Sequence, residues 1–423
     1  TYDQRGNVLS KTDPNGNTTT YTYDSMDRLL SITYADGSSV SFAYDANGNL
    51  VSRTGPLGVE TVYEYDQYNQ LIRKIRASGT SNEQVTEYTY DGRGNLASVT
   101  GPQNNTTTYN YDERNRLKSA TTPLGQTVEF QYDPAGNLTA RTDPNGNTIS
   151  YSYDALNRLT RVTDAEGHVT SYTYDMAGNL LSIDDANNHT AASNTYDAND
   201  RLTRTEDALG YGKDVTYTDG GRIQSETDAN GNTTNYVYDS TTGRLAEIQY
   251  PDGRTETYAY DAAGNLLSVS DSSTSITVSY TYDARNRVKT ETQLGQTITY
   301  EYDAAGNRTS MSIPDLGTFS YTYDAANRLT EITNPSGETA QINYFPDGQR
   351  ETITYDSGAA TAYSYDAANR LQSITHTRAD GSVVASFDYS YDNAANRLSV
   401  TDHNGDTITY NYDNTYKLTE AAY

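Results

Sequence analysis

The sequence predicts an all-β protein in which about twenty antiparallel β-hairpins stack into one repetitive array. Three observations predict this fold class. The dipeptide Tyr-Asp recurs at intervals close to 21 residues, residues alternate with a period of two ahead of it, and turn-forming residues separate the alternating runs. Twenty units cover the 423 residues without a break in composition. We therefore expect a single array over residues 1–423, with no separate catalytic or toxin domain.

Each unit contains a strand that leads into its Tyr-Asp pair. In the run Thr-Thr-Tyr-Thr-Tyr at residues 19–23, the alternation places Tyr21 and Tyr23 on one face of the strand. The position of Tyr21 is Tyr in 14 of the 20 units. Elsewhere it is mostly apolar, as in Phe42, Phe130, Val215 and Ile342. This position therefore favours apolar bulk.

A tight turn follows each Tyr-Asp pair. The third residue after Asp is Gly, Asn or Asp in 19 of 20 units when a one-residue slip is allowed in two of them, and Tyr416 is the exception. These residue types tolerate positive φ, and the Asp side chain can accept backbone hydrogen bonds as an Asx turn. We therefore expect these Asp residues to cap turns rather than to catalyse. The residues expected to build the structural repeat are Tyr23, Asp24, Tyr44, Asp45, Gly48, Asn49, Tyr132, Asp133, Gly136, Asn137, Tyr153, Asp154, Asn157, Arg158, Tyr174, Asp175, Gly178 and Asn179.

A second short strand and a linker turn complete the unit. The run Leu-Leu-Ser-Ile-Thr at residues 29–33 is typical of the strand, and Asp-Pro-Asn-Gly-Asn at residues 13–17 of the turn. Strand, turn, strand and turn in 21 residues predict about forty strands of five or six residues and nearly exclude helix. Two-stranded hairpins are marginally stable alone, so we expect neighbouring units to stabilise one another.

Two irregularities modify the array. Gly-Asn turns such as 136–137 alternate imperfectly with Asn-Arg turns such as 157–158, which gives a superrepeat of about 42 residues. Either two packing environments or an inherited duplication of a double unit produces this pattern. Two spacings are also longer than 21, with the added residues near Ser78–Glu83 and Thr377–Ser382. We interpret these as loop extensions at hairpin tips, with a plug or docking loop as the alternative.

Composition excludes several classes of function. The formal net charge of −26 argues against sequence-independent binding to nucleic acid or to an anionic membrane surface. No stretch approaches the length of an apolar membrane span, and the absence of Cys removes disulfides and thiolate ligands. An aromatic content of 11%, nearly all Tyr, argues against disorder.

No catalytic or cofactor-binding constellation stands out, so we expect neither an enzyme nor a cofactor. The four His residues fall in expected turns or loops far apart in sequence, and Asp356-Ser357-Gly358 lies where a turn is due. The oxygen-rich runs 143–147 and 228–232 hint at calcium loops, but their Gly comes too early for an EF-hand and the bidentate Glu is missing. We interpret both runs as turns, and we expect no metal site.

These motifs resemble a known family. Tyr132-Asp133-Pro134-Ala135-Gly136-Asn137-Leu138, followed by Thr148 to Asp154, is similar to the YD repeats, also called RHS repeats. Members include bacterial RHS toxins, the B and C components of insecticidal Tc toxins, wall-associated proteins and teneurins. The resemblance covers about the full chain. It implies a spiral β-shell or solenoid, which in the toxins encloses a toxic polypeptide.

The resemblance also guides the expected function. We expect a non-catalytic shell, part of a longer secreted or cell-surface protein, that encloses or presents polypeptide cargo or neighbouring domains of the same precursor. Two alternatives stay open at this point. Tyr rings beside Asn and Asp suit a glycan-binding adhesin, and open strand edges suit a self-assembling extracellular fibre.

Overall fold

The computed structural model is a single antiparallel β-sheet of 39 strands, and it describes residues 1–187 and 189–423. Every strand pairs with the strands that precede and follow it in the chain, as β1 with β2, β2 with β3 and β3 with β4. No helix occurs among the described residues, so none there could cross a membrane. The all-β prediction and its estimate of about forty strands are therefore confirmed.

The strands are short and evenly spaced. Most have five or six residues, as predicted from the 21-residue unit. Their bounds are β1 Ser10–Thr12, β2 Thr18–Tyr23, β3 Leu29–Thr33, β4 Ser39–Tyr44, β5 Leu50–Thr54, β6 Glu60–Tyr65, β7 Leu71–Arg76, β8 Gln84–Tyr90, β9 Leu96–Thr100, β10 Thr106–Tyr111, β11 Leu117–Thr121, β12 Thr127–Tyr132, β13 Leu138–Thr142, β14 Thr148–Tyr153, β15 Leu159–Thr163, β16 Val169–Tyr174, β17 Leu180–Asp184, β18 Thr190–Tyr196, β19 Leu202–Asp207, β20 Gly212–Tyr217, β21 Ile223–Thr227, β22 Thr233–Tyr238, β23 Leu245–Gln249, β24 Thr255–Tyr260, β25 Leu266–Asp271, β26 Ile276–Tyr282, β27 Val288–Gln293, β28 Gln296–Tyr302, β29 Arg308–Ile313, β30 Gly317–Tyr323, β31 Leu329–Thr333, β32 Thr339–Tyr344, β33 Arg350–Tyr355, β34 Ala360–Tyr365, β35 Leu371–Thr377, β36 Val383–Tyr391, β37 Arg397–Asp402, β38 Thr407–Tyr412 and β39 Leu418–Ala422.

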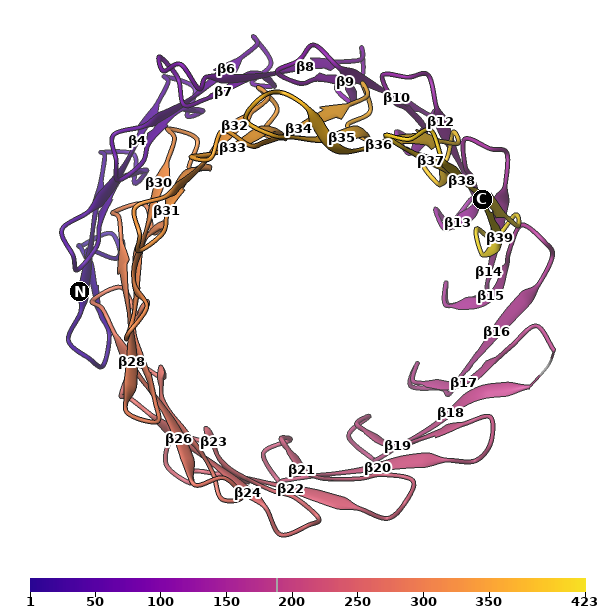
Figure 1. Ribbon diagram of the computed structural model, residues 1–423. Helices are drawn as coiled ribbons and strands as arrows, with labels where there is room; N and C mark the ends of the chain where they lie inside the picture. Colours follow the sequence, from indigo (N-terminus) through magenta and orange to yellow (C-terminus); the bar gives the residue numbers. More distant parts are fainter. Residues whose placement is uncertain (188) are drawn as a thin grey trace.

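A register shift recurs at the Tyr of the Tyr-Asp pairs. In the pair β14–β15, Ser152 lies opposite Arg161 but Tyr153 lies opposite Leu159, so one strand carries an extra residue. The same shift occurs in β12–β13 and β16–β17. A bulge bends its strand and increases the local twist. Repetition of the bulge along the sheet is consistent with the curvature of the ribbon into the ring of Figure 1.

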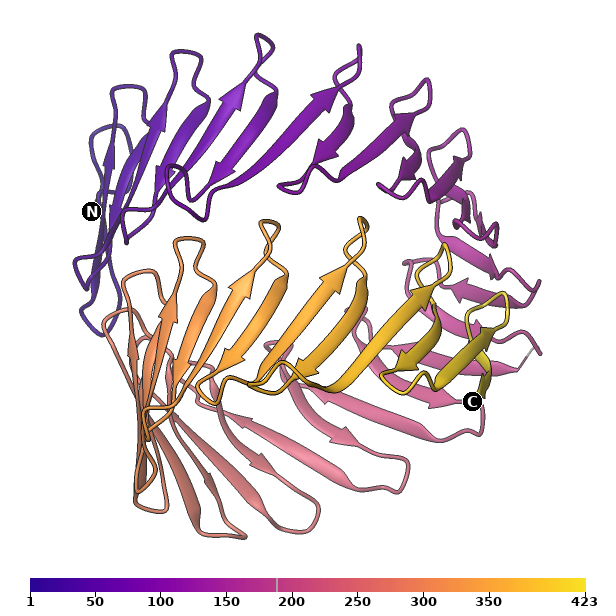
Figure 2. The same cartoon turned by 45° about the horizontal axis from the view of Figure 1, so that its top comes forward.

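The curved sheet winds through more than one round. In Figures 1 and 2, β30 to β38 follow the same arc as β4 to β12 and lie below them. We call residues 1–168 the first round and residues 261–423 the second round. Hydrogen bonds join residues 242 to 273 apart in sequence, as between Asn82 and Asp324 and between Asn286 and Asp13. The predicted spiral is therefore observed.

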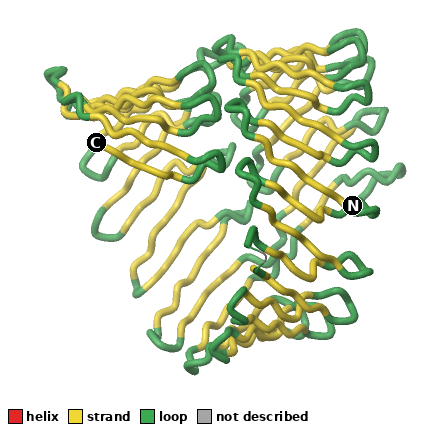
Figure 3. Tube along the Cα trace, turned by 90° about the vertical axis from the view of Figure 1, so that its right-hand side faces the viewer, coloured by secondary structure: helices red, strands yellow, loops and turns green. Residues whose placement is uncertain are grey.

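The strands end at two edges of the ribbon, where the loops of Figure 3 lie. Because neighbouring strands are antiparallel, the Tyr-Asp turns lie at one edge and the linker turns at the other. The linker-turn edge of the first round meets the Tyr-Asp edge of the second round. We call this contact the seam.

The sheet is one layer thick and has little core. Only four apolar residues are buried in the part of the chain that the structure describes, namely Val40, Ile75, Ala77 and Ala326. The accessible surface is 23785 Å², whereas a compact monomer of 46.6 kDa exposes about 16,000 Å². Ladder hydrogen bonds and contacts between turns must therefore stabilise much of the fold.

Three local expectations need comparison with the structure, and two of them were wrong. The segment Thr377–Ser382 is not a loop extension, because residues 378–382 form a five-residue turn like other linker turns and the extra length extends β35 and β36. His376 lies within β35, where its Nδ1 is 2.9 Å from Thr361 Oγ1, and not in a turn. The segment Ser78–Glu83 does lie in a longer loop, which contacts the second round through Asn82.

Candidate functional site

The Tyr-Asp turn is organised by its aspartate. Asp45 Oδ1 accepts hydrogen bonds from the backbone N–H groups of Asn47 at 2.9 Å and Asn49 at 2.8 Å. Gly48 adopts a φ of 94°, the left-handed region expected for this position. The Asn49 side chain donates to Asp45 Oδ2, and this bond holds the pKa of Asp45 below its ordinary value. The carboxylate therefore acts as a cap for its own turn.

The left-handed residue persists where the side chain does not favour it. Ala395 has a φ of 73° and Tyr416 a φ of 66°, and both donate a backbone hydrogen bond to the Asp three residues earlier. The one-residue shift that would move the left-handed conformation from Ala395 to Asn396 does not occur. This conformation costs roughly 1–2 kcal/mol for a residue with a Cβ. The array therefore maintains the turn against local preference.

Asn-Arg turns connect each unit to the next one through the guanidinium. Arg158 Nε donates to Asp154 Oδ2 at 2.6 Å, and its Nη1 donates to the backbone oxygen of Asp175 at 2.7 Å. The same guanidinium lies 4.9 Å from the ring centroid of Tyr174. Arg116 repeats the arrangement on Asp112, Asp133 and Tyr132. One side chain thus makes an ion pair, a forward hydrogen bond and a cation–π contact.

Gly-Asn turns make the equivalent connection with an amide. Asn137 Nδ2 donates to Asp133 Oδ2 at 2.9 Å and to Asn157 Oδ1 in the next turn at 2.8 Å. The forward acceptor is the side chain of a left-handed Asn. After an Asn-Arg turn the next left-handed residue is usually Gly, so the Arg reaches a backbone oxygen instead. A Cβ added to Gly264 would lie 3.0 Å from Arg244 Nη2, whereas one added to Gly136 or Gly178 would have no other atom within 4 Å, so the Arg fills this space at Gly264 but not in every turn.

This alternation explains the superrepeat of about 42 residues. A left-handed Asn offers a side-chain acceptor to an Asn in the preceding turn, whereas an Arg in the preceding turn donates to the backbone oxygen of the next Asp. Of the two explanations left open by the sequence, the two packing environments are therefore present in the fold. We call this pair of connections the interlock.

The tyrosine hydroxyls connect neighbouring strands. Tyr174 Oη donates to the backbone oxygen of Leu159 at 2.8 Å, and Tyr153 Oη donates to that of Leu138 at 2.9 Å. Tyr23 and Tyr44 make the same bond to Val8 and Leu29. Burial raises the pKa of Tyr153 above its ordinary value. The hydroxyl therefore satisfies a carbonyl just beyond the paired stretch of two strands.

The eighteen residues expected from the sequence do not converge on one point. All lie in or beside the Tyr-Asp turns of β2, β4, β12, β14 and β16 and repeat along one edge of the ribbon. The rings of Tyr44, Tyr132 and Tyr174 all contact an Arg of the preceding turn. Tyr132 differs from the other four Tyr because, among the described residues, its hydroxyl makes no hydrogen bond to a neighbouring strand, whereas theirs do. Their role as structural rather than binding residues stays a prediction.

Sequence reasoning missed the seam. Asn15 Nδ2 donates to Asp261 Oδ2 at 2.8 Å, and Asn145 Nδ2 donates to Asp392 Oδ2 at 2.9 Å. Gln84 Nε2 donates to the backbone oxygen of Pro346 at 2.8 Å. In each bond a linker turn or strand start of the first round contacts a Tyr-Asp turn of the second.

Charge and aromatic contacts reinforce the seam. Arg285 forms an ion pair with Asp36 at 3.6 Å, and its guanidinium lies 4.4 Å from the ring centroid of Tyr34. At the other end of the seam, the Tyr416 hydroxyl bonds to Asp143 and lies 2.9 Å from Asn147 Nδ2. A usable signal was present in the sequence, because several Tyr-Asp turns of the second round read Asp-Ala-Ala, as at residues 324–326.

The oxygen-rich runs do not assemble a metal centre. No group of three or more His, Asp or Glu arranged to hold a metal ion occurs among residues 1–187 and 189–423. In the two calcium-like runs, Asp143 accepts two backbone N–H groups and the Tyr416 hydroxyl, and Asp228 accepts two backbone N–H groups and the Asn232 amide. Both runs are turns, as interpreted from the sequence.

The bulged hairpins, the interlock and the winding sheet define a repeat protein of the β-shell class. The family model described as Teneurin YD-shell matches residues 1–143, 186–275 and 270–423, which is well over half of the chain. The model described as RHS Repeat matches residues 132–168 and 153–190. The chain therefore belongs to the YD-shell family, as its motifs indicated. A search of curated proteins finds no match.

Solved structures show the same fold. The structure titled TcdB2-TccC3 matches with a TM-score of 0.71 at 15% identity, covering 100% of this chain and 30% of that one. The Tc holotoxin pore of Photorhabdus luminescens matches with a TM-score of 0.71 at 15% identity, covering 96% of this chain and 27% of that one. The chain thus spans less than a third of the length of these structures.

Proposed function

We propose that this chain is a non-catalytic wall of a secreted or surface-displayed shell that encloses a polypeptide. The observation that carries the proposal is the exposed surface of the single-layer ring. The chain exposes 23785 Å², about half as much again as a compact protein of its mass, because neither face of the sheet is covered by a second layer. Such a wall presents a large inner surface to whatever the ring surrounds.

Three further points support this function. Family membership and the fold shared with TcdB2-TccC3 support a shell-forming role. The interlock and the seam engage charged turn residues such as Arg158 and Asp261 in connections within the wall. A glycan-binding surface and a self-assembling fibre are the alternative functions, and a shell that protects its contents from protease distinguishes the wall from both.

The test compares proteolysis of the polypeptide that adjoins the array in its precursor, with and without the array. We expect the adjoining polypeptide to survive protease when it is produced together with the array and to be digested rapidly when it is produced alone. Equal digestion rates in the two samples would overturn the proposal. The variant Ala326→Leu serves as a control, because weaker packing at the seam should speed digestion of the adjoining polypeptide.

A further inference from the structure

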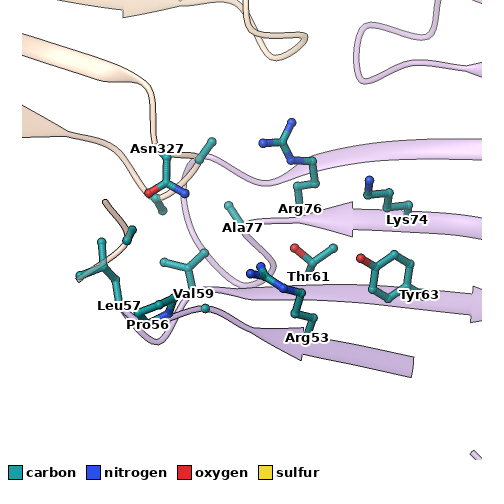
Figure 4. Close-up of a pocket in the computed structure, with 14 residues that line it drawn as sticks. Arg53, Pro56, Leu57, Val59, Thr61, Tyr63, Lys74, Arg76, Ala77 and Asn327 are labelled. Atoms are coloured by element: carbon teal, nitrogen blue, oxygen red, sulfur yellow. The ribbon is translucent and has the colours of Figure 1, made fainter. Parts of the chain in front are cut away.

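A cavity at the seam carries an unusual concentration of positive charge. It has a volume of about 360 Å³ and lies between strands β5 to β7 of the first round and two Tyr-Asp turns of the second. Arg53, Lys74 and Arg76 line it together with Thr61, Tyr63 and Asn327, as Figure 4 shows. Among the described residues, no Asp or Glu lines the cavity. In a chain of net charge −26, this absence of carboxylates distinguishes the site.

The strand register brings the three cations to one face of the sheet. Arg53 lies opposite Thr61, and Thr61 lies opposite Arg76, so these residues form a row across three strands. Lys74 precedes Arg76 by two residues and therefore shares its face. With strands about 4.8 Å apart, the backbones of Arg53 and Arg76 are separated by roughly 10 Å. All three head groups are thus able to reach one small ligand.

The three cations have no protein partner among the described residues. The side chains of Arg53, Lys74 and Arg76 form no ion pair and no hydrogen bond with any other described residue. The neighbouring Arg73 of β7 projects from the other face and contacts Glu64 at 3.5 Å and Glu87 at 3.8 Å. The nearby Asp324 is also engaged, because its carboxylate accepts from Arg328 Nε at 2.7 Å. Positive charge in the cavity is therefore left uncompensated.

An equivalent cavity further along the seam shows that the fold does not require these cations. It is lined by Val99 and Thr122 and has a volume of about 260 Å³. Val99 is the fourth residue of β9, as Arg53 is of β5. Ala120 lies three residues and Thr122 five residues after the start of β11. Lys74 and Arg76 lie at the same distances after the start of β7. The same backbone thus accepts Val, Ala and Thr in place of Arg, Lys and Arg.

A third cavity of the series shows how the chain neutralises a cation at the seam. There Lys11 stands in the position of Arg53, and Asp13 lines the same cavity. Arg285, which also lines it, is paired with Asp36. Carboxylates therefore accompany the cations in that cavity, whereas none accompanies those at Arg53, Lys74 and Arg76.

We propose that the cavity between Arg53, Lys74 and Arg76 binds a phosphate group. Arginine forks match the oxygen geometry of phosphate, and the lysine ammonium adds a point charge. Asn327 contributes a donor, because its Oδ1 already accepts from Asn307 Nδ2 at 3.0 Å and its own amide N–H groups are left for a ligand. The ligand is either free phosphate or a phosphate monoester of a small molecule. This site does not depend on the proposed function of the wall.

The test is calorimetric titration of the full chain with inorganic phosphate and with glycerol phosphate, at constant ionic strength set with chloride. We expect saturable binding of at least one of the two probes, and a preference between them identifies the source of the phosphate group. The variant Arg53→Val, Lys74→Ala, Arg76→Thr introduces the residues found at the equivalent positions Val99, Ala120 and Thr122 and should weaken binding at least tenfold. Arg141 holds in β13 the position that Arg53 holds in β5, but it does not line this cavity. The variant Arg141→Val should therefore leave binding unchanged.

The result that would overturn the proposal is the absence of saturable binding of either probe, or equal binding by the triple variant. Circular dichroism and scattering of the triple variant establish whether its ring is intact. If it is not, the single variants Arg53→Gln and Lys74→Met take its place, with an expected three- to tenfold weakening each. Unchanged affinity in both single variants would likewise refute the site.

Discussion

The Tyr-Asp turns of the two rounds share a backbone but differ in what lies against them. Leu156 and Ala326 both follow the turn aspartate by two residues, in Asp-Ala-Leu-Asn and Asp-Ala-Ala-Asn. Leu156, in the first round, is 68% exposed, whereas Ala326, at the seam, is 7% exposed. Met26 and Tyr68 share the position of Leu156 and are also exposed.

This difference separates two levels of constraint. The aspartate cap and the left-handed residue are needed in every turn, because they determine the local backbone. The residues between them are unconstrained at the Tyr-Asp edge of the first round, which we call the free edge. At the seam, Ala326 is buried because the linker turn around Pro56 and Leu57 packs there. The residue type at sites that the turn backbone does not constrain therefore depends on where the repeat lies in the spiral.

The largest expected effect comes from placing at the seam the larger side chain that the free edge carries at the same turn position. Ala326→Leu adds volume to a buried position and should lower the free energy of unfolding by about 1–3 kcal/mol. The reciprocal change Leu156→Ala removes an exposed side chain and should change it by less than about 0.5 kcal/mol. Denaturant unfolding of the two variants measures both values. Equal effects would show that the seam is not packed as described.

A smaller effect should show where the Arg of the interlock restricts the left-handed position of the next turn. Gly264→Asn and Gly136→Asn introduce the same residue at φ values of 103° and 101°, but only at Gly264 would the Cβ come within 4 Å of another residue, at 3.0 Å from Arg244. We expect Gly264→Asn to be more destabilising by about 1 kcal/mol.

The second change Arg244→Asn should recover part of that loss, because it recreates the bond that joins Asn265 to Asn286. A double-mutant cycle measured by denaturant unfolding gives the coupling between positions 244 and 264. A coupling of zero would show that Arg244 does not restrict the side chain at position 264.

The smallest effect concerns how acid changes the contribution of a free-edge aspartate, Asp112, to stability. Hydrogen bonds from the backbone and then the guanidinium of Arg116 lower the pKa of Asp112 to about 2. A carboxyl whose pKa is lower in the folded protein stabilises it above the unfolded pKa near 3.9, and this contribution is lost as the pH falls toward 2. Carbon-13 NMR titration of the Asp112 carboxyl should therefore show a midpoint near 2. A midpoint near 4 would refute the cap.

A matched substitution isolates the same contribution. Asp112→Asn removes the titrating group but retains an acceptor for the turn, so stability should depend less on pH between about 4 and 2 than in the unmodified chain. Because this aspartate lies at a solvent-exposed edge, we expect a small difference. An unchanged acid dependence would show that the Arg116 contact does not stabilise the folded state.

Much of the fold could be predicted from the sequence because the repeat unit encodes it locally. The alternation around Tyr21 and Tyr23 predicts the strand, and the residue types at Gly48 and Asn157 predict the left-handed turns. The loop predicted near Ser78–Glu83 is present. The one predicted near Thr377–Ser382 was wrong, because in β35 and β36 the added residues continue the ladder instead. The turn predicted at His376 was wrong for the same reason.

The candidate sites illustrate what escaped prediction. The Asp caps were expected, but nothing in a single unit shows that Arg158 reaches Asp175 or that Asn15 reaches Asp261. The first contact depends on the register between neighbouring hairpins, and the second on the curvature accumulated over more than ten of them. A small change in twist per hairpin would bring different residues to the seam.

The sequence by itself determined the hairpin, its turns and its repetition, because these depend on contacts within about twenty residues. Only the tertiary structure decided which turns meet across the seam. It also decided which cations, among the described residues, share the cavity with Arg53. The physical reason is that such pairings join residues some 240 to 270 positions apart, and their register follows from the pitch and diameter of the whole spiral.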